Sequence, residues 1–238
     1  MTNKILKFNV IIFIILFNFF DIKCEKIVIS SPIAERQFVD RVDIDEVVIE
    51  DGCGIEEIPD YAFLGCSSLR KVTLPEGMRK IGFQAFSECS SLESINFPAS
   101  LEDIGSNSFT YCEKLHNVQF PDSLVHIGHN AFSFCNSIEE VFLPDSLQEI
   151  ESYAFSDCKS LRKVRFPAND KMLGELILNC CPSVVEIIEP SPVPPTFDCD
   201  SFIFDPLDTA AYLRCTLIVP PSSIPAYRQS PSWSLFKL

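Results

Sequence analysis

The chain has 238 residues and a formal net charge of −14, with 33 Asp and Glu against 19 Lys and Arg. Such an acidic protein is a poor match for nucleic acid or anionic lipid, because both are bound by clusters of Lys and Arg. The length is sufficient to bury a sizeable hydrophobic core.

The N-terminus has the pattern of a secretory signal peptide. Lys4 and Lys7 precede an apolar run over residues 8–20. This run is shorter than the ~20 apolar residues that span a bilayer, and it suits the apolar part of a secretory signal. We expect residues 1–24 to be removed by cleavage near Cys24, leaving a chain with no transmembrane segment. A lipid anchor on Cys24 is disfavoured, because Lys23 stands where a small residue is needed.

Residues 25–57 precede the regular part of the sequence and are expected to form an N-terminal capping segment. Within them, "VDIDEVVIEDGCGIEEI" (residues 42–58) is typical of a strand followed by a turn. The pattern predicts that Val47, Ile49 and Ile55 point inward. Irregular terminal segments are expected where a repetitive core must be closed.

From residue 58 the chain repeats a 23-residue block six times, as in "IGFQAFSECSSLESINFPASLED" (residues 81–103). Position 1 of the block is Ile or Leu, position 6 is Phe in five blocks and Leu in the last, and position 9 is always Cys. Position 12 is Leu, Ile or Val, position 15 is Val or Ile, and position 18 is always Pro. The blocks begin at Ile58, Ile81, Ile104, Ile127, Ile150 and Leu173.

This period predicts a leucine-rich-repeat solenoid that is mostly β, a right-handed coil of stacked repeats with short parallel strands. One block cannot bury its apolar residues alone, whereas stacked blocks form a continuous core. In residues 92–98 we expect Leu92, Ile95 and Phe97 to point inward, and the following Pro ends the strand. The first half of each block forms the opposite wall, where glycines are expected to ease a tight corner: Gly82, Gly105 and Gly128.

The six repeats are expected to occupy residues 58–195 and a small C-terminal cap residues 196–238. In this cap Leu217 to Val219 predict a last strand, and Ser222 and Ser223 are placed to cap a short helix that ends at Gln229. Trp233 and Phe236 are expected to cover the final coil. All blocks serve one core, so the sequence predicts one domain.

The pattern "IGxxAFxxCxxLxxVxLP" resembles the BspA-like class of leucine-rich repeats, and the ending "TLIVPPSSIPAYRQSPSW" is similar to the C-terminal cap of many of its members. The resemblance covers residues ~47–238. It implies a secreted or surface protein, since the family is found in such proteins of bacteria and some protozoa, and some members act as adhesins. It implies no catalytic residue and no cofactor, because the family motif contains none.

The cysteines at position 9 are expected to be buried thiols. Side chains stacked in register point the same way, and a disulfide dihedral near 90° would then require distortion, whereas free Cys behaves as a small buried apolar residue. Among the remaining cysteines, a bridge between Cys199 and Cys215 across the C-terminal cap stays open. No Cys-x-x-Cys pair exists, which disfavours a zinc site.

The sequence offers little for catalysis. The three histidines, His116, His126 and His129, are expected at solvated variable positions. No nucleophile-elbow, phosphate-loop or His-Glu-x-x-His motif is present. Two Asp-x-Asp pairs, at residues 43–45 and 198–200, lack the further oxygen ligands of a calcium site. We therefore expect neither an enzyme nor a metal site.

Solenoids usually bind partners on the exposed side of their stacked strands, which here carries positions 13, 14 and 16. An ordinary polar surface is one interpretation of this face. A binding site is the other, because an exposed aromatic residue beside arginines is typical of interfaces. Phe142 and Arg165 are the expected anchors, as neighbours in one column. The full set of predicted binding residues is Phe142, Arg165, Arg162, Lys163, Glu140, Gln119 and Ile188.

Two classes of function stay open. The first is a secreted or cell-surface protein that binds a protein or glycan on another cell or in the extracellular matrix. The second is a structural or assembly component of an extracytoplasmic complex. The sequence specifies neither the ligand nor the oligomeric state.

Overall fold

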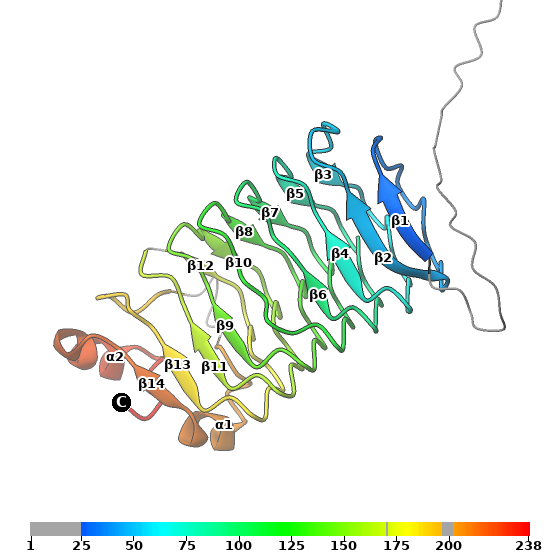
Figure 1. The fold of residues 1–238 in the computed structure, drawn as a ribbon. Coiled ribbons are helices and arrows are strands. Elements are labelled where there is room, and N and C mark those ends of the chain that lie inside the picture. Colours follow the sequence, from blue (N-terminus) through cyan, green and yellow to red (C-terminus); the bar gives the residue numbers. More distant parts are fainter. Residues whose placement is uncertain (1–24, 170, 197–201) are drawn as a thin grey trace, which may run out of the picture.

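The computed structural model describes residues 25–169, 171–196 and 202–238. They form an elongated parallel-strand coil of about seven turns, with the C-terminal helices at one end (Figure 1). The predicted signal peptide and Cys199 lie outside the described residues. The predicted leucine-rich-repeat solenoid is thus confirmed.

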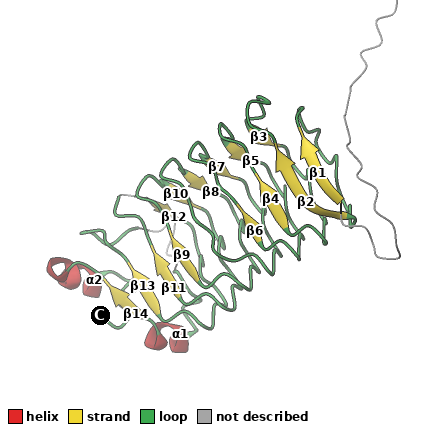
Figure 2. Cartoon of the chain, in the orientation of Figure 1, coloured by secondary structure: helices red, strands yellow, loops and turns green. Residues whose placement is uncertain are grey.

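The strands are short and parallel, and most of each turn is loop (Figure 2). They form three sheets, with the strand orders β1-β2-β4-β6, β9-β11-β13-β14 and β3-β5-β7-β8-β10-β12. The first two sheets lie along one wall and the third along another. Their bounds are β1 (Glu25–Ile29), β2 (Ile44–Ile49), β3 (Glu57–Ile58), β4 (Lys71–Thr73), β5 (Lys80–Ile81), β6 (Ser94–Ile95), β7 (Asp103–Ile104), β8 (His126–Ile127), β9 (Glu140–Phe142), β10 (Glu149–Ile150), β11 (Lys163–Arg165), β12 (Met172–Leu173), β13 (Glu186–Ile188) and β14 (Thr216–Ile218).

A row of phenylalanines runs through the core. Rings of successive turns stack with centroids 5.0–5.4 Å apart and nearly parallel planes. Each ring is buried, which is the inward position that the period predicted. The row consists of Phe38, Phe63, Phe86, Phe109, Phe132 and Phe155.

The N-terminal segment continues this core. Val47, Ile49 and Ile55 are buried as predicted. In addition, β1 and β2 extend the first sheet, and Phe38 stacks on Phe63. Residues 33–57 therefore contain one more turn, which begins at Ile33 and is two residues longer than the regular block.

The strand wall is interrupted at the third block. No strand forms at residues 116–120, so β6 and β9 belong to different sheets. Asn117 lies in the left-handed region with a φ of 52°, and this conformation is incompatible with an extended strand. The strand expected in this block is therefore absent.

The wall formed by positions 3–8 is linked by backbone hydrogen bonds between turns. The N–H groups of positions 4, 6 and 8 donate to carbonyls of the next turn, as in Glu88 N to Thr110 O at 2.8 Å. Every described residue at positions 4 and 8 has a positive φ, although only one of them is glycine. The position-8 residues are Gly65, Glu88, Tyr111, Phe134, Asp157 and Cys180, and Asp40 is their equivalent in the additional turn.

The glycines at position 2 have a different role from the one predicted. Gly82, Gly105 and Gly128 do not have a positive φ. Instead the backbone of the preceding turn lies very close: a Cβ on Gly128 would stand 2.5 Å from the amide nitrogen of Ser106. These glycines permit tight stacking of turns.

The six position-9 cysteines are buried thiols, as predicted. Each Sγ donates to the carbonyl oxygen of a core phenylalanine in the preceding turn, at 3.0–3.2 Å. Burial raises the pKa of Cys66 to about 12. Burial also raises the pKa of the thiols of Cys89, Cys112, Cys135 and Cys158, which lowers their reactivity because the thiolate is the reactive form.

The C-terminal cap closes the coil with α1 (Thr209–Arg214), β14, the 3₁₀ turn η1 (Pro221–Ser223) and α2 (Ile224–Gln229). The helix ends at Gln229 as predicted, but Ser223 makes no side-chain capping bond. Trp233 and Phe236 are buried, and the indole Nε1 of Trp233 donates to Pro195 O at 3.0 Å.

An ion pair lies in the core beside the cap. Lys171 Nζ is 3.1 Å from Glu189 Oε1, and both side chains are fully buried. Glu189 occupies position 17, where the other blocks carry Leu or Phe, and burial raises the pKa of its carboxyl group. A buried pair of this kind holds two segments in one arrangement, because either charge alone would be costly.

Candidate binding face on the C-terminal strands

The register of β9, β11 and β13 places the predicted residues in two outward columns. In each strand the middle residue is buried and its neighbours point to solvent, as alternation requires. Arg165 pairs with Phe142 on one side and with Ile188 on the other. The second column contains Glu140, Lys163 and Glu186 in register.

Phe142 is the exposed aromatic residue of this face. Phe142 is 46% exposed, although the central residue of its strand is fully buried. Lys163 Nζ is 5.9 Å from the centre of its ring, within the range of a cation–π contact. Phe142 is therefore held by the sheet while one side of it stays open to a partner.

Arg165 is engaged within the protein. Its guanidinium donates to Leu143 O and to Asp145 Oδ1, both at 3.1 Å. Asp145 in turn accepts from Ala168 N at 2.9 Å, and this bond, together with Arg165, lowers the pKa of the Asp145 carboxyl group. The arginine is thus pre-oriented beside Phe142, and its role as an anchor stays a prediction.

The basic cluster is partly neutralised. Lys163 forms an ion pair with Glu186 at 2.7 Å, and this hydrogen bond raises the pKa of the lysine. Arg162 is exposed and has no ion-pair partner within the described ranges. The guanidinium of Arg162 is therefore the positive group most available to a ligand.

Gln119 is separated from the other predicted residues. It is exposed, but it lies in the interrupted third block, where no ladder joins it to Phe142. The structure therefore brings together six of the seven predicted residues.

Two residues of this face were not predicted. Ile218 on β14 pairs with Ile188 and is 43% exposed, and Val185 is 40% exposed at position 13. Ile218 was missed because it lies 30 residues after Ile188, outside the 23-residue period; its signal was the predicted strand at Leu217–Val219. We use "C-terminal strand face" for Glu140, Phe142, Arg162, Lys163, Arg165, Val185, Ile188 and Ile218.

The other polar candidates have structural partners. Asp43 and Asp45 pair with Arg41 and Arg70, and the second Asp-x-Asp pair lies outside the described residues. His126 was expected to be solvated, but its Nδ1 lies 2.7 Å from Asp103 Oδ1 and its Nε2 3.3 Å from Glu151 Oε1. Its hydrogen bond to Asp103 is the main cause of the raised pKa of the imidazole.

The described residues give no support for a metal site or a membrane-spanning helix, and the predicted disulfide falls partly outside them. Within residues 25–169, 171–196 and 202–238, no group of three His, Cys, Asp or Glu side chains is placed to hold a metal ion. In the same ranges no helix is long and apolar enough to cross a membrane. Cys215 is buried, and its bridge to Cys199 stays a prediction because Cys199 is not described.

The stacked parallel strands, the 23-residue period and an exposed strand face define a leucine-rich-repeat protein, a class whose members generally bind other proteins. The model of the BspA type Leucine rich repeat region matches residues 31–144 and 56–185 in six copies. The chain belongs to this family.

Solved structures agree with the assignment. A leucine rich repeat protein from T. pallidum is 33% identical with a TM-score of 0.62, over 77% of this chain and 82% of that one. A leucine-rich repeat protein from Bacteroides ovatus is 19% identical with a TM-score of 0.52, over 81% of this chain and 64% of that one, and it shows the fold alone. The comparison with curated proteins gives no match.

Proposed function

We propose that this protein is secreted or displayed at the cell surface and binds a partner protein through its C-terminal strand face. The observation that carries the proposal is that exposed apolar side chains lie on both sides of Arg165 in one sheet, Phe142 on one side and Ile188 and Ile218 on the other. Phe142, Val185 and Ile218 are 40–46% exposed. Exposed aromatic and aliphatic residues interspersed with Arg on a sheet face are typical of protein interfaces.

A glycan is the other partner that such a face could bind. The shape and composition of the C-terminal strand face favour a protein. The face is formed by strands rather than by a deep pocket, and its apolar residues are bordered by the charged side chains of Arg162 and Lys163. Removing a central aromatic anchor typically costs ~2–4 kcal/mol of binding free energy. Bordering charges affect mainly the association rate and its salt dependence.

The extracellular part of the proposal rests on residues 1–24 and on the family. N-terminal sequencing of protein recovered from the culture medium tests it. A chain beginning near residue 25 is expected, and a chain that stays inside the cell with residues 1–24 attached contradicts it.

The binding test uses the full chain and a panel of extracellular-matrix proteins and glycans. Phe142→Ser and the pair Phe142→Ser with Arg165→Glu are compared with Leu207→Ser, which removes an exposed apolar residue that is not part of the face. Circular dichroism first establishes that all variants are folded. We expect loss of binding in the face variants alone. Equal loss in Leu207→Ser, or no binding by any form, contradicts the proposal.

A structural or assembly role is the alternative, and β1 favours it. This five-residue strand forms the edge of the first sheet, and an uncovered edge can pair with a strand of another chain. Light scattering after size exclusion tests this role. An assembly that Val28→Lys, a change on β1, converts to monomers supports the alternative, and a monomeric wild type contradicts it.

A further inference from the structure

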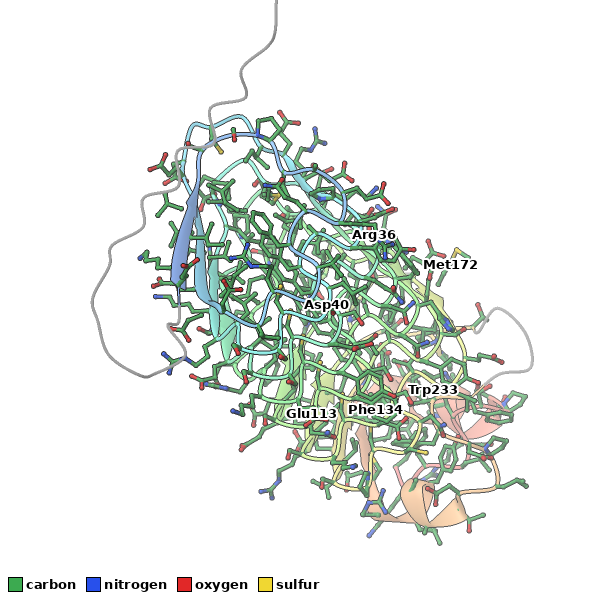
Figure 3. The ribbon with its side chains drawn as sticks, turned by 90° about the vertical axis from the view of Figure 1, so that its right-hand side faces the viewer. Arg36, Asp40, Glu113, Phe134, Met172 and Trp233 are labelled. Carbon is green, nitrogen blue, oxygen red and sulfur yellow. The ribbon has the colours of Figure 1, made fainter. Side chains whose placement is uncertain are left out.

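An open hollow lies on the loop wall formed by positions 8 and 10, away from the C-terminal strand face. It has a volume of about 650 Å³ and involves four successive turns. Its lining combines small residues, Gly65, Ser67 and Ser90, with the larger side chains of Asp40, Val42, Glu88 and Tyr111. Figure 3 labels Asp40 and, further along the same row, Phe134.

Gly65 has no side chain, and this leaves room for the Asp40 side chain in the row of position-8 residues. Gly65 has a φ of 72°, and a Cβ built there would collide with the carboxylate of Asp40. The Asp40 side chain therefore lies across the glycine. The backbones of Asp40 and Glu88 are two turns apart, about 10 Å at the spacing of stacked chains, and the Asp40 carboxylate leans toward the turn of Glu88.

An aromatic surface closes one end of the hollow. Tyr111 stacks on Phe134 with ring centroids 4.4 Å apart and planes 13° from parallel. Tyr111 is 42% exposed. Since one face of its ring is covered by Phe134, the other face is directed along the coil axis toward the turn of Glu88. A ring face next to a carboxylate is an arrangement that attracts cations.

The charge of the hollow also favours a cationic ligand. None of its lining residues is Lys, Arg or His, and Asp40 and Glu88 form no ion pair with any residue of the described ranges. Arg41, next to Asp40 in sequence, is paired with Asp43 and Glu25. Two carboxylates without a cation beside them create a negative potential in a concave site.

We propose that this hollow binds a basic segment of a partner protein. One Arg or Lys side chain lies on the open face of Tyr111 beside Glu88, and a second pairs with Asp40. In a polyproline II segment, residues three apart lie on the same side at a separation of about 9 Å, which is close to the two-turn spacing between the backbones of Asp40 and Glu88. The site is independent of the C-terminal strand face.

The test measures binding of the blocked peptide Gly-Arg-Pro-Pro-Arg-Gly to the purified full chain by calorimetry at low salt. The neutral peptide Gly-Gln-Pro-Pro-Gln-Gly is the ligand control. We expect only the arginine peptide to bind, with an affinity that falls as salt screens the charges. No binding of the arginine peptide, or equal binding of the neutral one, overturns the proposal. Equally tight binding of tetramethylammonium also overturns it, in favour of a small quaternary ammonium ligand.

Variants locate the site. Glu88→Gln and Tyr111→Asn are expected to weaken binding at least about fivefold each, the effect of losing one charge or one cation–π contact. Asn is chosen because it tolerates the left-handed conformation at position 8, and Glu88→Gln serves if Tyr111→Asn does not fold. Asp157→Asn is the matched control, since Asp157 has the same position and backbone conformation but lies outside the hollow. If Asp157→Asn weakens binding as much as Glu88→Gln, the attraction is a property of the whole acidic chain and the proposal is wrong.

Discussion

Replacing Phe109 tests whether the stacked phenylalanines stabilise the coil. Phe109 is fully buried, and its ring stacks between Phe86 at 5.4 Å and Phe132 at 5.1 Å, with Phe97 edge-on at 5.8 Å. Truncating such a core residue to Ala costs about 3–5 kcal/mol. Leu keeps most of the buried apolar surface but loses three ring contacts of ~0.5–1.5 kcal/mol each. We expect a loss of about 4 kcal/mol for Phe109→Ala and of about 2 kcal/mol for Phe109→Leu.

Urea unfolding followed by two signals measures this loss. Circular dichroism reports on the whole coil, whereas fluorescence of Trp233, the one tryptophan of the chain, reports on the C-terminal end. Coincident curves indicate that the turns unfold together. Phe142→Leu, on the exposed face, is the control and should stay within ~0.5 kcal/mol of the wild type. If Phe109→Ala lowers the free energy of unfolding by less than about 1 kcal/mol, the stacked phenylalanines do not stabilise the core as proposed.

Three further predictions concern the polar groups. In the native protein the buried position-9 thiols should not react with a thiol reagent, whereas Cys180 should react because it is exposed, although its pKa is raised. Labelling of Cys135 before denaturant is added contradicts this. Lys171→Met should lower the free energy of unfolding by about 3–5 kcal/mol, because it leaves Glu189 buried without its cation, and an unchanged urea midpoint contradicts the pair's role. The raised pKa of His126 means that its contribution, ~0.2–1 kcal/mol, is fully present below about pH 6.5 and is lost as pH rises through the folded-state pKa. His126→Gln should therefore lower the melting temperature more at pH 5.5 than at pH 8.5. An equal change in melting temperature at the two pH values excludes this contribution.

The fold could be predicted from the sequence because the residues that recur with the 23-residue period are the residues that form the core. Phe63, Cys66 and Leu69 recur every 23 residues, and stacking equal residues is the arrangement that buries all of them. The additional N-terminal turn was not recognised because it is 25 residues long and carries Arg41 where the other turns have Cys. Phe38, its core residue, is identified only by its contact with Phe63.

The candidate site was less predictable, because its properties depend on contacts outside the repeat. The pairing of Phe142 with Arg165 followed from the period, but the ion pair of Arg165 with Asp145 depends on side-chain geometry. The break at Asn117 depends on a backbone conformation that Asn tolerates without requiring it. The hollow beside Tyr111 depends on one glycine, Gly65, at a position where the other described turns carry a residue other than glycine.

The left-handed residues of position 8 have a consequence for how this protein can change. Their backbone hydrogen bonds are the same whether the side chain is Gly, Glu, Tyr, Phe or Asp. Except at Gly65, where a Cβ would collide with Asp40, a side chain that tolerates the left-handed conformation therefore alters the surface there without altering the core. Inserting or deleting one whole repeat would move every later residue of the row by one turn, about 5 Å. Recognition along this wall therefore depends on the order and spacing of side chains. Duplication of a single repeat would change this spacing while the contacts within the core stay the same.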